Sequence, residues 1–191
     1  RGKLAQARAY GARVEERDDF EAALAEAREL EERGTHILVN SLNPLRLQGQ
    51  KTAAFEIAEE LGAAPGVLAL PYGGGGNVRA YALGFGEDGS APRLVAAEAA
   101  DRPGTRASAI RISEPAHREA AERAIAESGG EVVRLRDDEI LAAWRLLARE
   151  EGVFCEPASA AGVAGLRKSA AAGTLDPDVL VVAVLASSMS G

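Results

Sequence analysis

The sequence has few of the residues that build disulfides and metal centres. Of its 191 residues, one is a cysteine, Cys155, and two are histidines, His36 and His117. A single cysteine excludes a disulfide within the chain and is typical of a reducing compartment. The histidines are far apart in sequence, His117 is expected on an exposed helix, and no cluster of metal ligands is recognisable. No apolar run approaches the roughly 20 residues that a membrane-spanning helix needs.

The charge and composition of the chain exclude further classes of partner. The chain carries 29 acidic and 22 basic residues, a formal net charge of −7, whereas surfaces that bind nucleic acids are basic. Apolar residues make up 47% and charged residues 27%, which is the balance of a soluble globular protein. A chain of 191 residues is long enough for one good core, or for one domain and part of another. We therefore expect neither a nucleic-acid nor a membrane partner.

Short runs rich in valine and leucine alternate along the chain with patterns of helical period. This alternation predicts an α/β fold with a largely parallel sheet flanked by helices. Strands are predicted at residues 12–15, 36–39, 67–70, 94–97, 132–135 and 179–185. Helices are predicted at residues 3–10, from Asp18 to Gly34, around Ala54 to Leu61, at 77–85, from Ser113 and Pro115 to Gly129, from Asp137 to Gly152, and from Pro157.

A run of four glycines follows the predicted strand 67–70 and precedes Asn77, where a helical pattern begins. Glycine permits positive φ angles and lets the backbone approach a ligand closely. Free N–H groups at a helix N-terminus form a site for a phosphate group. The run is not a nucleotide fingerprint, because Val78 stands where G-x-G-x-x-G requires its third glycine. On the residues alone, a flexible turn without a ligand is an equally good interpretation.

A polar turn at residues 40–44 follows the predicted strand 36–39. In parallel sheets, ligands bind beyond the carboxyl ends of the strands, where this turn and the glycine run are both expected. Asn40, Ser41 and Arg46 offer an amide, a hydroxyl and a guanidinium, which suit a phosphate or a carboxylate. Alternatively, Asn40 and Ser41 cap the following helix and Arg46 is a solvated surface charge. The residues by themselves favour this second interpretation.

Five segments of the chain have the residues and the order of one enzyme family. The more specific are Val-Asn-Ser-Leu-Asn-Pro-Leu-Arg-Leu-Gln-Gly-Gln-Lys-Thr (39–52) and Ala-Arg-Glu-Glu-Gly-Val-Phe-Cys-Glu-Pro-Ala-Ser-Ala-Ala (148–161). The others are Gly-Lys-Leu-Ala-Gln (2–6), Leu-Pro-Tyr-Gly-Gly-Gly-Gly-Asn (70–77) and Ala-Ile-Arg-Ile (109–112). Together they cover most of the chain, which resembles the threonine synthases, pyridoxal-phosphate enzymes of the tryptophan-synthase-β (fold type II) group.

The resemblance implies a domain organisation, a cofactor and a reaction. Residues 15–191 would form the large α/β domain that binds pyridoxal phosphate, incomplete at both ends, and residues 1–14 the end of the small domain or the start of the large one. The implied reaction converts O-phospho-L-homoserine and water to L-threonine and phosphate. Asn40, Ser41 and Arg46 match positions that bind the substrate's phosphate. The loop that binds the cofactor's phosphate is matched by Gly73, Gly74, Gly75, Gly76 and Asn77.

Some features of the family have no counterpart in the sequence. The family's Schiff-base lysine lies in a Ser-x-Lys-Asp-Arg segment, and Lys3, Lys51 and Lys168 all lack that context. The catalytic residue is therefore unassigned, and we expect an incomplete enzyme that is inactive alone. The family's partner of the pyridine nitrogen falls within residues 186–191, where Ser187 or Ser188 offers a hydroxyl.

Two alternatives to a threonine synthase stay open. Many family members carry asparagine where this chain has Gly74, so another fold type II lyase, such as a threonine or serine dehydratase or a cysteine synthase, is one of them. The other is a non-catalytic α/β module that retains a phosphate-binding loop. For an enzyme of the family, the resemblance implies a cytoplasmic homodimer at full length.

Overall fold

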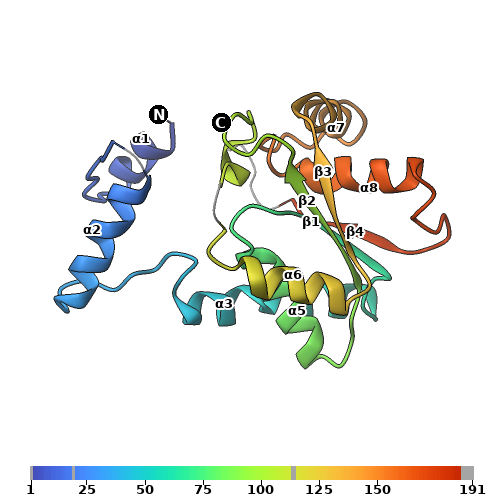
Figure 1. The fold of residues 1–191 in the computed structure, drawn as a ribbon, viewed down its shortest axis with the longest axis horizontal. Helices are drawn as coiled ribbons and strands as arrows, with labels where there is room; N and C mark the ends of the chain where they lie inside the picture. Colours follow the sequence, from blue (N-terminus) through green and yellow to red (C-terminus); the bar gives the residue numbers. More distant parts are fainter. Residues whose placement is uncertain (1, 19, 113–114, 186–191) are drawn as a thin grey trace. The chain divides into compact units, whose positions relative to one another are not determined.

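The computed structural model describes residues 2–18, 20–112 and 115–185, and the chain divides into two compact units, Arg1–Asn43 and Pro44–Gly191 (Figure 1). The domain boundary expected at residues 14–15 stays a prediction. None of the helices in the described ranges has the length and apolar character needed to cross a lipid bilayer.

The first unit contains two helices, α1 (Gly2–Ala9) and α2 (Phe20–Glu32), and a polar turn that begins at Asn40. The predicted strands at residues 12–15 and 36–39 are wrong, because both segments have irregular backbone. Ile37 and Val39, expected to be buried, are 77% and 76% exposed. A run with strand propensity becomes a strand only when a neighbour completes its hydrogen-bond ladder, and the described part of this unit forms none.

The second unit is built on four parallel strands in the order β3-β2-β1-β4. All five residues of β1 are buried, as are six of the seven residues of β2. Strands buried on both faces have continuous apolar sequences, which explains the valine- and leucine-rich runs. The predicted parallel α/β sheet is thus confirmed. The strands are β1 (Val67–Pro71), β2 (Arg93–Ala99), β3 (Glu131–Leu135) and β4 (Val181–Ala183).

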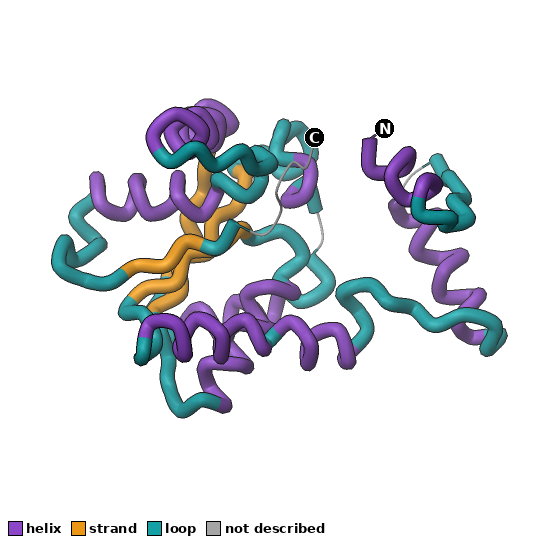
Figure 2. Tube along the Cα trace, turned by 180° about the vertical axis from the view of Figure 1, so that it is seen from behind, coloured by secondary structure: helices purple, strands orange, loops and turns teal. Residues whose placement is uncertain are grey.

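Helices cover both faces of this sheet (Figures 1 and 2). Leu68 and Leu70 point to the side of α5 and α6, where they pack with Val78 and Phe85. Val67 and Ala69 point to the opposite side, where α7 and α8 lie. The helices of the second unit are α3 (Pro44–Gln50), α4 (Thr52–Leu61), α5 (Gly76–Glu87), α6 (Arg118–Glu127), α7 (Asp137–Glu150) and α8 (Ala161–Ala171), with a 3-10 turn at Ser108–Ile110.

Three predicted boundaries in this unit are corrected. Pro157 begins a series of turns rather than a helix, and α8 starts only at Ala161. The helix expected from Ser113 or Pro115 begins at Arg118, and Ser113 lies outside the described residues. The last strand is confined to Val181–Ala183, the segment that pairs with β1.

The order of the strands places a topological switch point beside β1. From β1 the chain passes through α5 to β2 and through α6 to β3, moving towards one edge of the sheet. It then returns through α7 and α8 to β4, on the other side of β1. In open α/β sheets of this kind, ligands bind outside the carboxyl ends of the strands at the point where the winding reverses. The segment that follows β1 is the run of four glycines.

Candidate functional site

Residues 73–77, here called the glycine loop, follow the carboxyl end of β1 and include the first two residues of α5. The sheet ladder ends at Tyr72, whose N–H donates to the Ala97 carbonyl at 2.7 Å. Gly75 is the residue before α5 and has φ +84°, in the left-handed region that glycine adopts without a steric penalty. The loop thus turns sharply at the switch point and leads into a helix N-terminus.

Three carbonyl groups of the glycine loop each accept a hydrogen bond from a different donor. Gly73 O accepts from Arg102 Nη1 at 3.1 Å, and Gly74 O accepts from the His117 N–H at 3.0 Å. Gly75 O accepts from the Arg79 N–H at 3.0 Å. In a planar trans peptide, the carbonyl of one residue and the N–H of the next point in opposite directions. The N–H groups of the next three glycines therefore point away from these donors.

The N–H groups of residues 73–78 donate to no acceptor within the described part of the chain. Gly74, Gly76 and Asn77 are partly exposed, so solvent or a ligand can reach this segment. Successive N–H groups without acceptors, at the positive end of a helix, favour an anion. The geometry therefore fits a phosphate group and does not require any side chain to bind it.

Close packing explains why glycine is needed at two of these positions. A Cβ on Gly73 would lie 3.1 Å from the Ala109 carbonyl oxygen, and one on Gly75 would lie 3.0 Å from the His117 carbonyl oxygen. The nearest atom to a Cβ on Gly74 would be Ile112 Cδ1, at 3.5 Å, an ordinary van der Waals contact. Position 74 thus has room for a side chain.

The Asn77 side chain is oriented by Gln50, the last residue of α3. Gln50 Nε2 donates a hydrogen bond to Asn77 Oδ1. With its oxygen engaged, the Asn77 amide presents its NH₂ group as a further donor in the first turn of α5. A role for Asn77 in the loop was predicted from the sequence, whereas the contribution of Gln50 was not.

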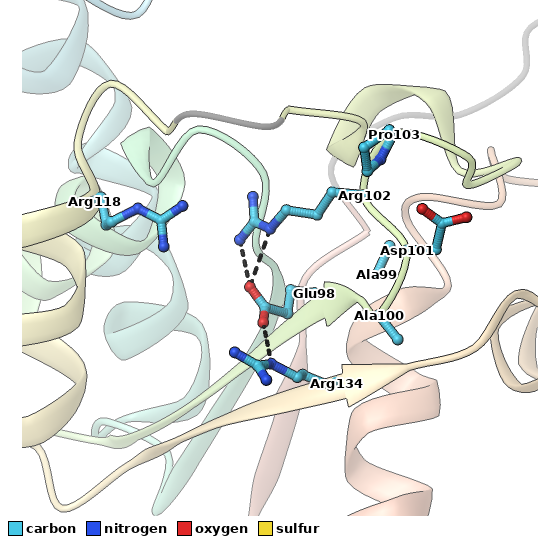
Figure 3. A pocket seen from close by; sticks show the side chains of 8 residues that line it. All are labelled: Glu98, Ala99, Ala100, Asp101, Arg102, Pro103, Arg118 and Arg134. Atoms are coloured by element: carbon cyan, nitrogen blue, oxygen red, sulfur yellow. Dashed lines mark hydrogen bonds and ion pairs between the residues drawn. The ribbon is translucent and has the colours of Figure 1, made fainter.

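Arg102, which donates to the glycine loop, belongs to an ion-pair network with Glu98 and Arg134 (Figure 3). Glu98, in β2, accepts from Arg102 Nε at 3.2 Å, from Arg102 Nη2, and from Arg134 Nε at 2.8 Å. The Arg102 guanidinium also lies 5.0 Å from the centre of the Tyr72 ring. The network borders an open pocket of about 430 Å³, lined by Glu98, Ala99, Ala100, Asp101, Arg102, Pro103, Arg118 and Arg134.

The Glu98 carboxylate makes the stability of the fold dependent on pH. Burial alone would raise its pKa, but hydrogen bonds from Arg102 and Arg134, together with their charges, hold the pKa below its ordinary 4.5. A pKa that is depressed in the folded state gives stability above the ordinary value, and this stability is lost as the pH falls through the folded value. We expect the urea midpoint to fall more between about pH 7 and about pH 3 for the unsubstituted chain than for Glu98→Gln. Equal falls would show that Glu98 is not a main source of acid sensitivity.

The three residues expected to bind the substrate's phosphate are divided between the two units. Asn40 Oδ1 accepts from the Leu42 N–H at 2.8 Å, a local turn that lies before α3 and does not cap that helix. Ser41 is partly buried in the same turn. Arg46 lies on α3, where it is exposed. Asn40 and Ser41 belong to the first unit and Arg46 to the second.

The remaining residues named from the sequence have other environments. His117 is buried, contrary to the exposed helix expected, and its backbone binds the glycine loop. Cys155 is buried, and burial raises the pKa of its thiol, which agrees with a structural role. Lys51 pairs with Glu87 at 2.5 Å, and Lys168 donates to the Arg134 carbonyl at 2.8 Å. Ser187 and Ser188 lie outside the described residues.

Comparison of the sequence with known proteins shows the family of the chain. Residues 1–187 match the model of a family described as "Pyridoxal-phosphate dependent enzyme". The chain is 46% identical over 202 residues to the threonine synthase of Halalkalibacterium halodurans, covering 96% of this chain and 57% of the relative. It is 49% identical over 185 residues to the threonine synthase of a Synechocystis species, covering 87% of this chain and 48% of the relative. The chain therefore spans about half the length of the curated relatives it matches.

The fold has counterparts among solved structures. The crystal structure of serine racemase from Dictyostelium discoideum superposes with a TM-score of 0.77 at 21% identity, covering 100% of this chain and 66% of that one. At this identity the likeness shows the fold, and it confirms the fold type II class expected from the sequence. The family match over nearly the whole chain and the identity to curated relatives lead to one conclusion: the chain belongs to the pyridoxal-phosphate-dependent enzymes.

Proposed function

We propose that this protein functions as a threonine synthase, which converts O-phospho-L-homoserine and water to L-threonine and phosphate with pyridoxal phosphate as cofactor. The observation that carries the proposal is the glycine loop, whose N–H groups have no acceptor within the described residues and lie at the switch point of the sheet. Identities of 46% and 49% to threonine synthases favour this reaction over other reactions of the family.

The residues of the glycine loop fit the phosphate of the cofactor. Backbone N–H groups would bind its oxygens, and the absence of side chains at residues 73–76 would let the phosphate approach the backbone. The Asn77 amide, oriented by Gln50, would add a donor. When bound, pyridoxal phosphate supplies an electron sink for reactions at the carbons of an amino acid, and the protein supplies position and electrostatics.

We propose that none of this chain's lysines supplies the amine that binds the cofactor covalently. Lys51 and Lys168 are engaged with Glu87 and with the Arg134 carbonyl. Borohydride reduction of the chain with pyridoxal phosphate, followed by peptide mass mapping, should give scattered or absent labelling. A stoichiometric adduct at Lys51, together with threonine formation, would overturn this part of the proposal.

We also propose that Asn40, Ser41 and Arg46 bind the phosphate of the substrate, and that the full-length enzyme is a homodimer. In the full-length enzyme, Arg46→Ala should raise KM for O-phospho-L-homoserine by roughly ten-fold or more, because a charge-assisted contact is worth about 1.5–3 kcal/mol. Arg46 is exposed and lies in a short helix, so the melting temperature should change little. Arg28→Ala, at an exposed arginine in α2, provides a control. An unchanged KM would leave Arg46 as a surface charge.

The reaction itself is tested by supplying the full-length gene product with pyridoxal phosphate and candidate substrates. O-phospho-L-homoserine should yield threonine and inorganic phosphate in equal amounts. Turnover of L-threonine or L-serine to ammonia without use of the phosphorylated substrate would instead identify a dehydratase. Phosphate binding without turnover of any of these amino acids would favour the non-catalytic module.

A further inference from the structure

We infer that Arg102, in the segment after β2, is a positioning residue that orients the glycine loop for a phosphate group. The inference rests on the proposed function, because it concerns how the proposed cofactor site is held in shape. Arg102 would not touch the phosphate itself. Its effect would pass through the carbonyl of Gly73, to which its Nη1 atom donates at 3.1 Å.

Arg102 joins three separate segments of the chain. The same Nη1 atom donates to the Ile112 carbonyl at 2.8 Å, and the Nε and Nη2 atoms donate to Glu98. The Arg102 and Glu98 side chains are 11% and 10% exposed, so this network is largely shielded from water. The planar guanidinium presents its donors in a fixed fork. The carboxylate of Glu98 therefore fixes the plane of the guanidinium, and the guanidinium fixes the carbonyl of Gly73.

The orientation of one carbonyl determines the orientation of the next N–H. Because the peptide between Gly73 and Gly74 is planar, holding the Gly73 carbonyl towards Arg102 turns the Gly74 N–H to the opposite side. Both residues are glycines, so rotation of this peptide meets little steric resistance from side chains. Without Arg102, the peptide would sample several orientations. Only a fraction of the molecules would then be competent to bind, and apparent affinity falls in proportion to that fraction.

Direct attraction between Arg102 and the anion would be a different mechanism, and salt distinguishes the two. Glu98 offsets part of the positive charge of Arg102 and Arg134, which weakens any net attraction. Attraction between separated charges is screened by salt, whereas the orientation of a peptide held by direct hydrogen bonds is not. The ratio of the dissociation constants of variant and parent should therefore stay constant as the salt concentration rises.

The chain contains a matched control at the opposite end of the same strand. Arg93, the first residue of β2, pairs with Glu131 at 2.8 Å and donates to the carbonyls of Gly129 and Thr174 at 3.3 and 2.7 Å. It thus makes the same kinds of bond as Arg102, at the amino end of the sheet and away from the glycine loop. Arg93→Met and Arg102→Met should both destabilise the fold, but only Arg102→Met should weaken binding.

The experiment is a titration of the ¹⁵N-labelled chain, followed through the amide signals of Gly74, Gly75 and Gly76. The ligands are inorganic phosphate, pyridoxal phosphate and, as a control without phosphate, pyridoxal. Arg102→Met should raise the dissociation constants of both phosphate ligands roughly ten-fold, the value expected when about a tenth of the molecules are competent. Arg102→Lys should recover little, because lysine keeps the charge but cannot reproduce the fork. Arg93→Met should bind like the parent.

The outcomes separate the inference from the proposed function. If the unsubstituted chain shows no shift of the loop signals with phosphate or pyridoxal phosphate, the proposed cofactor site fails. If it binds but Arg102→Met binds within about two-fold of it, or Arg102→Lys binds equally well, the positioning role fails. If the loss of affinity in Arg102→Met disappears at high salt, Arg102 acts by direct attraction of the anion and not by positioning the loop. Should Arg102→Met not fold, Arg102→Lys and the more conservative Glu98→Gln, which loosens the guanidinium, carry the same test.

Discussion

Replacing Gly84 with alanine is expected to destabilise the second unit by about 1–3 kcal/mol, although alanine is the better helix former. Gly84 lies in α5 where this helix crosses the start of α4. A Cβ at this position would lie 2.3 Å from the Lys51 carbonyl oxygen and 2.7 Å from Ala54 Cβ. The Lys51 carbonyl is fixed because it accepts the Ala54 N–H at 3.0 Å, and Ala54 is fully buried. Neither atom can move without separating the helices.

The same substitution two residues further along α5, at Gly86, is expected to stabilise the unit instead. A Cβ on Gly86 would have no atom within 4 Å, and Gly86 does not have a positive φ. Gly86→Ala should therefore stabilise the unit by about 0.5–1 kcal/mol, the difference in helix propensity. Urea unfolding of the parent and the two variants measures both effects. Equal effects of the two substitutions would show that α4 and α5 do not pack as closely as this structure describes.

The elements that could be predicted from the sequence are those with local signals. The strands β1 and β2 contain continuous apolar runs, and β3 contains the shorter pair Val132 and Val133. The helix α7 and the glycine loop begin and end at residues with clear helix and turn propensities. Residues 36–39 have an equally apolar run, yet they form no strand. The two segments differ in whether a neighbouring strand is present. The strand β1 is paired on both sides, whereas no ladder forms in the described part of the first unit. Pairing is a property of distant residues, and a local pattern cannot contain it.

The candidate site was predictable to a similar extent. The glycines and Asn77 indicate a phosphate loop because conformational freedom and helix N-termini are local properties. The groups that hold this loop are distant in sequence. Arg102 is 29 positions from Gly73, to which it donates, and the His117 N–H is 43 positions from Gly74. Arginine in a polar loop has no distinguishing pattern, and only the structure shows that Arg102 is buried against Glu98.

Removing the carboxylate of Glu98 is expected to have the largest effect on stability. In Glu98→Met, the nearly buried Arg102 loses its partner, and breaking a buried ion pair on one side typically costs about 3–5 kcal/mol. The open pocket beside the network admits water to the freed guanidinium, so we expect a loss near 3 kcal/mol. Arg134 contributes little to this loss, because its side chain is 79% exposed.

The double variant separates the ion pair from the other contacts of Arg102. Arg102→Met alone leaves Glu98 buried with only Arg134 as a partner, and also removes the donor of the Gly73 and Ile112 carbonyls. When both side chains are replaced, no buried charge is left without a partner, since Arg134, which also loses Glu98, is 79% exposed. The loss at the two carbonyls then persists. The combined loss should therefore be smaller than the sum of the single losses by at least about 1 kcal/mol. Additive losses in urea unfolding would mean that Glu98 and Arg102 stabilise the fold independently, in which case the carboxylate does not fix the guanidinium behind the glycine loop.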